Sequence, residues 1–145
     1  MLVQLARRWT PDAPGPVSLA EVAADEDLPR AYLEQLIIPL REAGLVTSTR
    51  GARGGYALAR RPAEITMAEV LRALEGPLAP MICASEDPSH AGDCARAGGC
   101  SVNYLWLEVR DAISAVLARL TLADLLPAIR RVAITPRRER DPVSV

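Results

Sequence analysis

The chain has no long apolar run and only one histidine. No stretch reaches the ~18 consecutive apolar residues of a membrane span. The first residues, MLVQLARRW, also lack the basic, apolar and small segments of a secretory signal. We therefore expect a cytoplasmic protein with no membrane partner. One histidine and no close pair of acids in an apolar setting leave no acid–base constellation, which argues against an enzyme.

Lysine is absent too, but a biased genome explains this as readily as function does. The net charge is only -1, which argues against a protein that binds nucleic acid over its whole surface. The arginines are unevenly spread. Between positions 29 and 61 there are only two acidic residues but six arginines, and this excess of positive charge predicts a local basic surface. The arginines are Arg30, Arg41, Arg50, Arg53, Arg60 and Arg61.

At 145 residues and 50% hydrophobic, the chain can bury one real core. Apolar periodicity, capping boxes and turn residues predict the order of the elements. We expect helices over residues 1–9, 18–24, 30–43, 66–74, 101–120 and 121–132, strands over 45–49 and 56–58, and a mobile tail over 133–145. Pro39 lies inside the third helical pattern and should bend or shorten that helix.

Two helices joined by a tight turn and followed by a glycine- and arginine-rich hairpin are typical of a winged helix-turn-helix. The expected fold is therefore mainly α with a small β-wing, followed by a long dimerisation helix. We assign residues 1–76 to the winged DNA-binding domain, 77–100 to a cysteine-bearing sensor loop, 101–132 to dimerisation helices and 133–145 to a flexible tail. A long apolar stripe on the helix from Ser101 indicates that this helix packs against a partner.

The second helix of such a motif reads the major groove with its N-terminal turns. This selects Arg30, Ala31, Tyr32, Glu34 and Gln35 as candidate DNA-binding residues. Glutamine can pair with adenine, glutamate with cytosine, and arginine with guanine or phosphate. Arg50 and Arg53 on the hairpin can enter a minor groove or hold phosphates. The alternatives are a solvated helix face and an ordinary glycine-rich hairpin.

The only three cysteines are Cys83, Cys94 and Cys100, all in the loop before the long helix. Thiolates suit zinc or an iron–sulfur cluster, and a complete site usually needs four ligands. His90, Asp93, Asn103 or a group from a second subunit are candidates for the fourth. Unliganded thiols that act as a redox switch are the alternative.

Several runs of residues resemble a bacterial family that includes the iron–sulfur cluster regulator IscR and the nitric-oxide-sensing repressor NsrR. They are YLEQL from Tyr32, LREAGLV from Leu40, RGARGGY from Arg50 and ITMAEV from Ile65. The resemblance covers nearly the whole chain. It implies a homodimeric winged-helix transcription factor that binds a double-stranded DNA operator.

On the family pattern, Cys83, Cys94 and Cys100 would hold a 2Fe-2S or 4Fe-4S cluster, and Glu34, Gln35 and Arg50 would meet DNA. Regulators resembling IscR carry a histidine ligand where this chain has Asn103, so the fourth ligand is open.

We therefore expect a homodimeric DNA-binding regulator, a repressor by preference, that senses iron–sulfur, redox or nitric oxide status through its cysteine loop. The alternatives are a cluster-free regulator that uses a thiol switch or a partner protein, and a winged-helix module that binds proteins.

Overall fold

A computed structural model of the chain describes residues 1–10, 15–51, 54–90, 93–96 and 99–126. It is mainly helical with one two-stranded antiparallel sheet, as the sequence predicts. The elements are α1 (Leu2–Arg7), α2 (Leu19–Glu26), α3 (Arg30–Glu42), β1 (Val46–Thr49), β2 (Gly55–Leu58), 3-10 helix η1 (Pro62–Glu64), α4 (Met67–Glu75), 3-10 helices η2 (Ile82–Ala84) and η3 (Pro88–His90), α5 (Ser101–Arg119) and 3-10 helix η4 (Leu122–Leu125).

The helix-turn-helix consists of α2 and α3. The capping box that starts α2 is complete, because the Glu21 N–H donates to Ser18 Oγ at 3.1 Å and the Ser18 N–H donates to Glu21 Oε2 at 3.0 Å. The helix ends at Asp27, whose φ of 51° lies in the left-handed region that stops a helix. A proline at position 29 then precedes the first residue of α3.

Pro39 does not shorten α3, which continues to Glu42. Proline has no N–H and removes one backbone bond, here the one to the carbonyl of residue 35. The loss falls in the last turn, where the helix is about to end. The Ala43 N–H still donates to the Pro39 carbonyl at 2.9 Å, so the chain after the proline keeps its helical path.

The wing is the hairpin of β1 and β2, paired in the register Val46↔Leu58 to Thr49↔Gly55. It is fastened to the start of α2 by a two-way backbone bridge, in which the N–H of Val17 and the N–H of Tyr56 each donate to the other's carbonyl at 2.9 Å. The wing therefore keeps a fixed position relative to the helix-turn-helix.

Up to Leu126, the last described residue, the segment after Thr121 forms the short 3-10 helix η4, where the sequence predicts the start of an α-helix from Thr121 to about Val132. The Thr121 N–H donates to the Asp124 carboxylate at 2.8 Å, which is the expected cap. Leu122 is buried in the core of the winged domain, the unit formed by α1–α4 and the wing. Burial of Leu122 thus holds η4 against this domain. Residues 127–132 lie outside the described residues, as does the tail 133–145.

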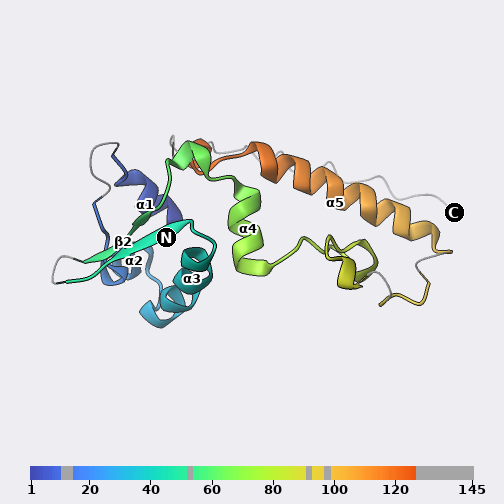
Figure 1. The fold of residues 1–145 in the computed structure, drawn as a ribbon, viewed down its shortest axis with the longest axis horizontal. Helices are drawn as coiled ribbons and strands as arrows, with labels where there is room; N and C mark the ends of the chain where they lie inside the picture. Colours follow the sequence, from blue (N-terminus) through green and yellow to red (C-terminus); the bar gives the residue numbers. More distant parts are fainter. Residues whose placement is uncertain (11–14, 52–53, 91–92, 97–98, 127–145) are drawn as a thin grey trace, which may run out of the picture.

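The C-terminal part of the long helix α5 packs against α4, and the rest of α5 extends away from the winged domain (Figure 1). Its C-terminal end lies at this domain, and its N-terminal end lies at the cysteine loop. All of α5 is described and none of its residues is buried. None of the helices in the described ranges is long and apolar enough to cross a membrane.

The core lies between α1, α2, α3, the wing and α4, and Leu40 is 0% exposed in it. Leu40→Ala should lower the free energy of unfolding by about 2–5 kcal/mol, because the cavity adds to the lost transfer free energy. Urea unfolding at one fixed protein concentration measures this. Ile38→Ala on the same helix is the matched control, since Ile38 is 50% exposed. Equal losses for both variants would contradict the assignment of the buried face.

Candidate nucleic-acid interface and cysteine loop

The N-terminal half of α3 presents its polar face to solvent. Leu33, Ile37 and Leu40 pack into the core on the opposite face of the helix. The five residues that the sequence selects as candidate groove readers are all exposed: Arg30, Ala31, Tyr32, Glu34 and Gln35. The fold therefore makes all five accessible to a duplex.

Arg30 and Glu34 form an ion pair across one turn of this face, with Arg30 Nε 2.8 Å from Glu34 Oε1. Both side chains are more than half exposed, so the pair adds little stability. The pair holds the guanidinium and the carboxylate next to each other on the exposed face of the helix. The contact uses Arg30 Nε and Glu34 Oε1, so the two terminal nitrogens of the guanidinium and the second carboxylate oxygen can still bind another group.

The wing places Arg50 at the tip of the hairpin, exposed. Gly51, next to it, has a φ of 119°, a conformation that favours glycine. Arg53 lies outside the described residues. The accessible Arg50 guanidinium is suited to a phosphate or a narrow groove.

The two glycines that follow, Gly54 and Gly55, lie against the backbone of other residues. In the structure a Cβ at Gly54 would lie 2.3 Å from the Thr49 carbonyl oxygen, and one at Gly55 would lie 2.5 Å from that of Val17. These close approaches are internal, so Gly54 lets the hairpin turn tightly and Gly55 lets it approach Val17, just before α2.

A hollow of about 350 Å³ separates α3 from the start of α2 and from β2. Arg41 lines it together with Arg30, Glu34 and Tyr56. The sequence pattern does not single out Arg41 as a DNA-binding residue, although its spacing of seven from Glu34 places both residues on one helix face. Arg41 is exposed and is therefore a further candidate for a phosphate contact.

The three cysteines are free and partly exposed. Cys83 lies in η2, Cys94 lies in an irregular segment, and Cys100 is the residue that precedes α5. Among the residues that the structure describes, no three of the His, Cys, Asp and Glu side chains are grouped so that they could hold a metal ion. As they lie, the thiols do not form a ligand set for an iron–sulfur cluster.

Both Asn103 and His90, each a candidate fourth ligand, have other partners. Asn103 Nδ2 donates to the Cys83 carbonyl at 2.9 Å, and the Asn103 N–H donates to the Cys100 carbonyl at 3.1 Å. Asn103 therefore joins the two cysteine-bearing ends of the loop. His90 Nδ1 lies 2.7 Å from Asp93 Oδ2, and this hydrogen bond raises the pKa of His90 above its ordinary value.

The chain matches the model of the Rrf2 family, described as iron-dependent transcriptional regulators, over residues 1–128. It is 40% identical over 126 residues to the regulator CymR of Bacillus subtilis, covering 86% of this chain and 80% of CymR. The structure of that protein, titled the global cysteine regulator, matches at 41% identity with a TM-score of 0.66, covering 86% of each chain.

Two further solved structures are similar to this chain. T. potens IscR matches at 38% identity and a TM-score of 0.65, covering 86% of this chain and 77% of that one. The oxidized form of Staphylococcus aureus CymR matches at 34% identity and a TM-score of 0.62, covering 88% of each chain. These relatives are transcriptional regulators rather than enzymes. With a family match over most of its length, the chain belongs to the Rrf2 family of winged helix-turn-helix transcriptional regulators.

Proposed function

We propose that the protein is a cytoplasmic, homodimeric regulator that binds a double-stranded operator through α3 and the wing, and that its cysteine loop carries the signal. The observation that carries the proposal is the exposed side of α3, where the five candidate DNA-binding residues are accessible while the apolar face of the helix is buried. Arg50 on the wing and Arg41 beside the hollow supply positive charge next to it. Family membership supports the DNA-binding role.

The homodimer rests on α5. Several apolar side chains of this helix are exposed, and apolar patches of this kind mark interaction surfaces. A second copy of the chain can cover them symmetrically. Dimers of this type place two recognition helices into half-sites about 34 Å apart. The proposed dimer therefore sets the distance between the two copies of α3.

For the signal we propose the redox state of the loop thiols. Oxidation of two thiols to a disulfide releases two protons and two electrons to an oxidant such as a peroxide or another disulfide. Two observations support this chemistry. The three cysteines are free and partly exposed, with no grouped ligand set among the described residues, and a relative has a structure titled as its oxidized form.

An iron–sulfur cluster on Cys83, Cys94 and Cys100 is the second candidate. It is favoured by the family description, iron-dependent, and by the structural likeness to an IscR. The thiol switch and the cluster can be told apart by purifying the protein anaerobically and measuring its visible absorption and its iron and sulfide content. A brown protein bleached by oxygen would favour the cluster, and a colourless one after attempted reconstitution would favour the thiols.

The DNA-binding role predicts a specific loss for Arg50→Ala. A duplex selected by the wild-type protein from a random-sequence library is the probe, and fluorescence anisotropy over a salt series is the measurement. We expect about tenfold weaker binding and a salt-dependence slope smaller by about 0.9 for each phosphate that the variant no longer neutralises.

Arg61→Ala is the matched control for Arg50→Ala. Arg61 lies in the same basic stretch, but next to η1 rather than on the wing, and its Nε is 3.9 Å from Glu64 Oε1. The control should leave both affinity and slope unchanged. Equal losses for the two variants would show a general charge effect instead of binding by the wing, and no specific binding by the wild type at low salt would favour a protein-interaction module.

A further inference from the structure

Helices α4 and α5 diverge from one backbone joint. The Met67 N–H donates to the Leu120 carbonyl at 2.8 Å, and the Leu122 N–H donates to the Ile65 carbonyl at 2.9 Å. Ile65 and Leu122 are both buried, so the joint is part of the core. The C-terminal end of α5 is therefore fixed to the winged domain, while the rest of α5 lies outside it (Figure 1).

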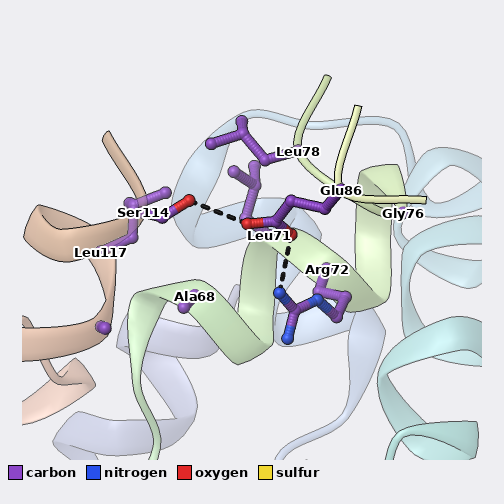
Figure 2. Close-up of a pocket in the computed structure, with 9 residues that line it drawn as sticks. Ala68, Leu71, Arg72, Gly76, Leu78, Glu86, Ser114 and Leu117 are labelled. Carbon is purple, nitrogen blue, oxygen red and sulfur yellow. Dashed lines mark hydrogen bonds and ion pairs between the residues drawn. The ribbon is translucent and has the colours of Figure 1, made fainter. Parts of the chain in front are cut away.

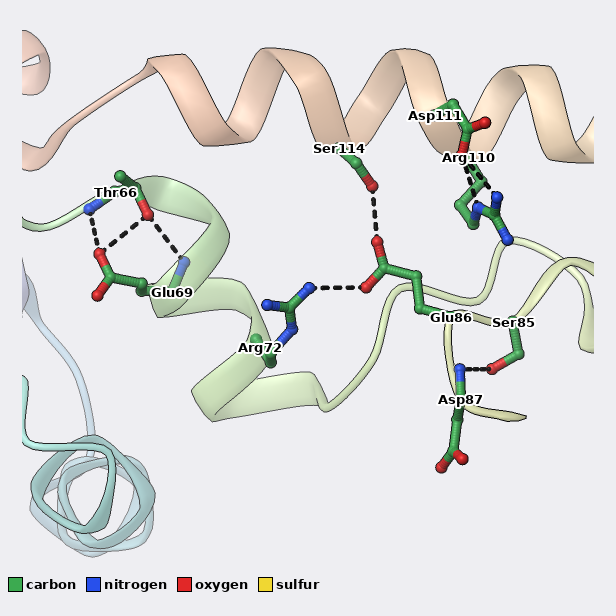
Figure 3. A network of polar contacts seen from close by, with 9 residues as sticks. All are labelled: Thr66, Glu69, Arg72, Ser85, Glu86, Asp87, Arg110, Asp111 and Ser114. Atoms are coloured by element: carbon green, nitrogen blue, oxygen red, sulfur yellow. Dashed lines mark hydrogen bonds and ion pairs between the residues drawn. The ribbon is translucent and has the colours of Figure 1, made fainter. Parts of the chain in front are cut away.

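Farther from the joint, one carboxylate connects the two helices. Glu86 Oε2 accepts a hydrogen bond from Arg72 Nη2 of α4 at 2.8 Å, and Glu86 Oε1 accepts one from Ser114 Oγ of α5 at 2.9 Å (Figure 3). Glu86 belongs to neither helix, because it lies in the loop that carries the cysteines. We call these three residues the crossbar. A joint at one end and a crossbar beyond it together fix the angle between α4 and α5.

The crossbar lies beside a hollow of about 180 Å³ between the helices and the loop (Figure 2). Leu71, Leu78 and Leu117 line it, so Glu86 has apolar neighbours as well as its two polar partners. The Glu86 side chain is 25% exposed and that of Arg72 is 64% exposed. The hydrogen bond from Arg72, followed by that from Ser114, lowers the pKa of Glu86, so the group is held as a carboxylate.

The same loop segment is tied directly to Cys83. The Cys83 carbonyl accepts the hydrogen bond from Asn103 at the start of α5, and the adjacent Ala84 is buried. The Glu86 N–H donates to the Leu78 carbonyl at 3.2 Å. Only two residues, Ala84 and Ser85, separate Cys83 from Glu86. A rearrangement of the backbone at Cys83 is therefore expected to displace the Glu86 carboxylate as well.

We propose that Glu86 is the positioning residue that transmits the state of the cysteine loop to the winged domain, by fixing the angle between α4 and α5. This inference rests on the proposed function of the loop as the sensor. When the loop rearranges, Glu86 leaves Arg72 or Ser114, and α5 turns about the joint. Because α4 packs on the core through Val70, the whole winged domain keeps its position relative to α4 and changes its orientation relative to α5.

A change in this angle alters DNA binding because the proposed dimer is built on α5. Turning each winged domain relative to its α5 changes the distance between the two copies of α3. Two half-sites one helical turn apart can be bound together only when the two copies of α3 have the matching separation, so operator affinity depends on the distance between them. The crossbar thus links two packed arrangements to two operator affinities.

The test compares operator affinity in two states, the protein purified anaerobically and the same protein after exposure to air and diamide. For the wild type we expect a ratio between the states of about 5- to 150-fold, the usual range of coupling between sites. Glu86→Ala should bring the ratio to within about twofold of one. A residue that only stabilises the fold would change both affinities together and leave the ratio intact.

Glu75→Ala is the matched control, because Glu75 is an exposed glutamate at the end of α4 with no hydrogen bond or ion pair from its side chain to another residue in the described part of the chain. It should keep the wild-type ratio.

Arg72→Glu combined with Glu86→Arg reverses the ion pair and should recover part of the ratio that either change alone removes. If Glu86→Ala does not fold, Ser114→Ala removes one arm of the crossbar and should reduce the ratio.

Two results would overturn the inference. A wild-type ratio of one would show that the loop does not signal, and the proposed function would fail together with the crossbar. A wild-type protein that responds, with Glu86→Ala responding equally, would leave the proposed function standing and remove Glu86 from it. The wild-type data alone tell these two failures apart.

Discussion

Replacing Val116 of α5 by glutamate is expected to separate the proposed dimer and to weaken operator binding by about 100-fold or more. A dimer binds its second half-site intramolecularly, and linked binding of this kind strengthens the complex by about 10²–10⁴. A monomer keeps only one half-site and loses that gain. Sedimentation velocity measures the dimer, and anisotropy on the selected duplex measures the affinity.

Val116 is chosen because of its place on the exposed stripe of α5. It is 41% exposed although apolar, and Leu105 on the same helix is 55% exposed. Val102, Val109 and Val116 recur every seven residues, the spacing that keeps one seam of a helix against a partner helix. A glutamate in this seam would have to be buried without a partner, which costs several kcal/mol for a charge.

The adjacent change Ala115→Glu is the control. Consecutive residues of a helix point about 100° apart, so Ala115 lies at the edge of the seam rather than in it, and it is exposed, so a glutamate there can reach solvent. Both variants add one negative charge and one helix-compatible side chain. Ala115→Glu should therefore stay dimeric with nearly unchanged affinity. If both variants stayed dimeric, α5 would not form the interface.

The parts of the fold that follow from local rules could be predicted from the sequence. The capping boxes at Ser18 and Thr66 form as expected, since each depends only on residues three apart. The helical pattern from Arg30 also gives α3 with its buried face. Its continuation past Pro39 could not be read locally, because the cost of a lost backbone bond depends on how close the helix is to its end.

The candidate site was less predictable where contacts span long stretches of chain. The crossbar joins Glu86 to residues 14 and 28 positions away, and no local pattern marks either partner. The role of Gly55 depends in the same way on Val17, far from it in sequence. The sequence makes Asn103 a candidate ligand, and only the fold shows that its side chain donates a hydrogen bond to the Cys83 carbonyl. Composition indicates which groups are available, and only the fold shows their partners.

Replacing Cys94 by alanine is expected to abolish the response of operator affinity to oxidation and to leave the fold intact. The ratio of affinities between anaerobic and oxidised protein should fall from about 5- to 150-fold to about one. Cys94 is free and partly exposed in an irregular segment, so its removal leaves no large cavity. The free energy of unfolding should change by no more than about 0.5–1 kcal/mol.

The neighbouring change Ala95→Ser is the control, because it alters the same exposed segment and keeps the thiol. It should respond as the wild type does. Loss of the dimer on Cys94→Ala, seen by sedimentation, would instead assign the loop a structural role. A full response without Cys94 would restrict the signal to Cys83 and Cys100, which Asn103 already joins through its side-chain and backbone N–H groups. The signal would then arise at the end of α5 that lies farther from the winged domain, and the crossbar would be the connection between them.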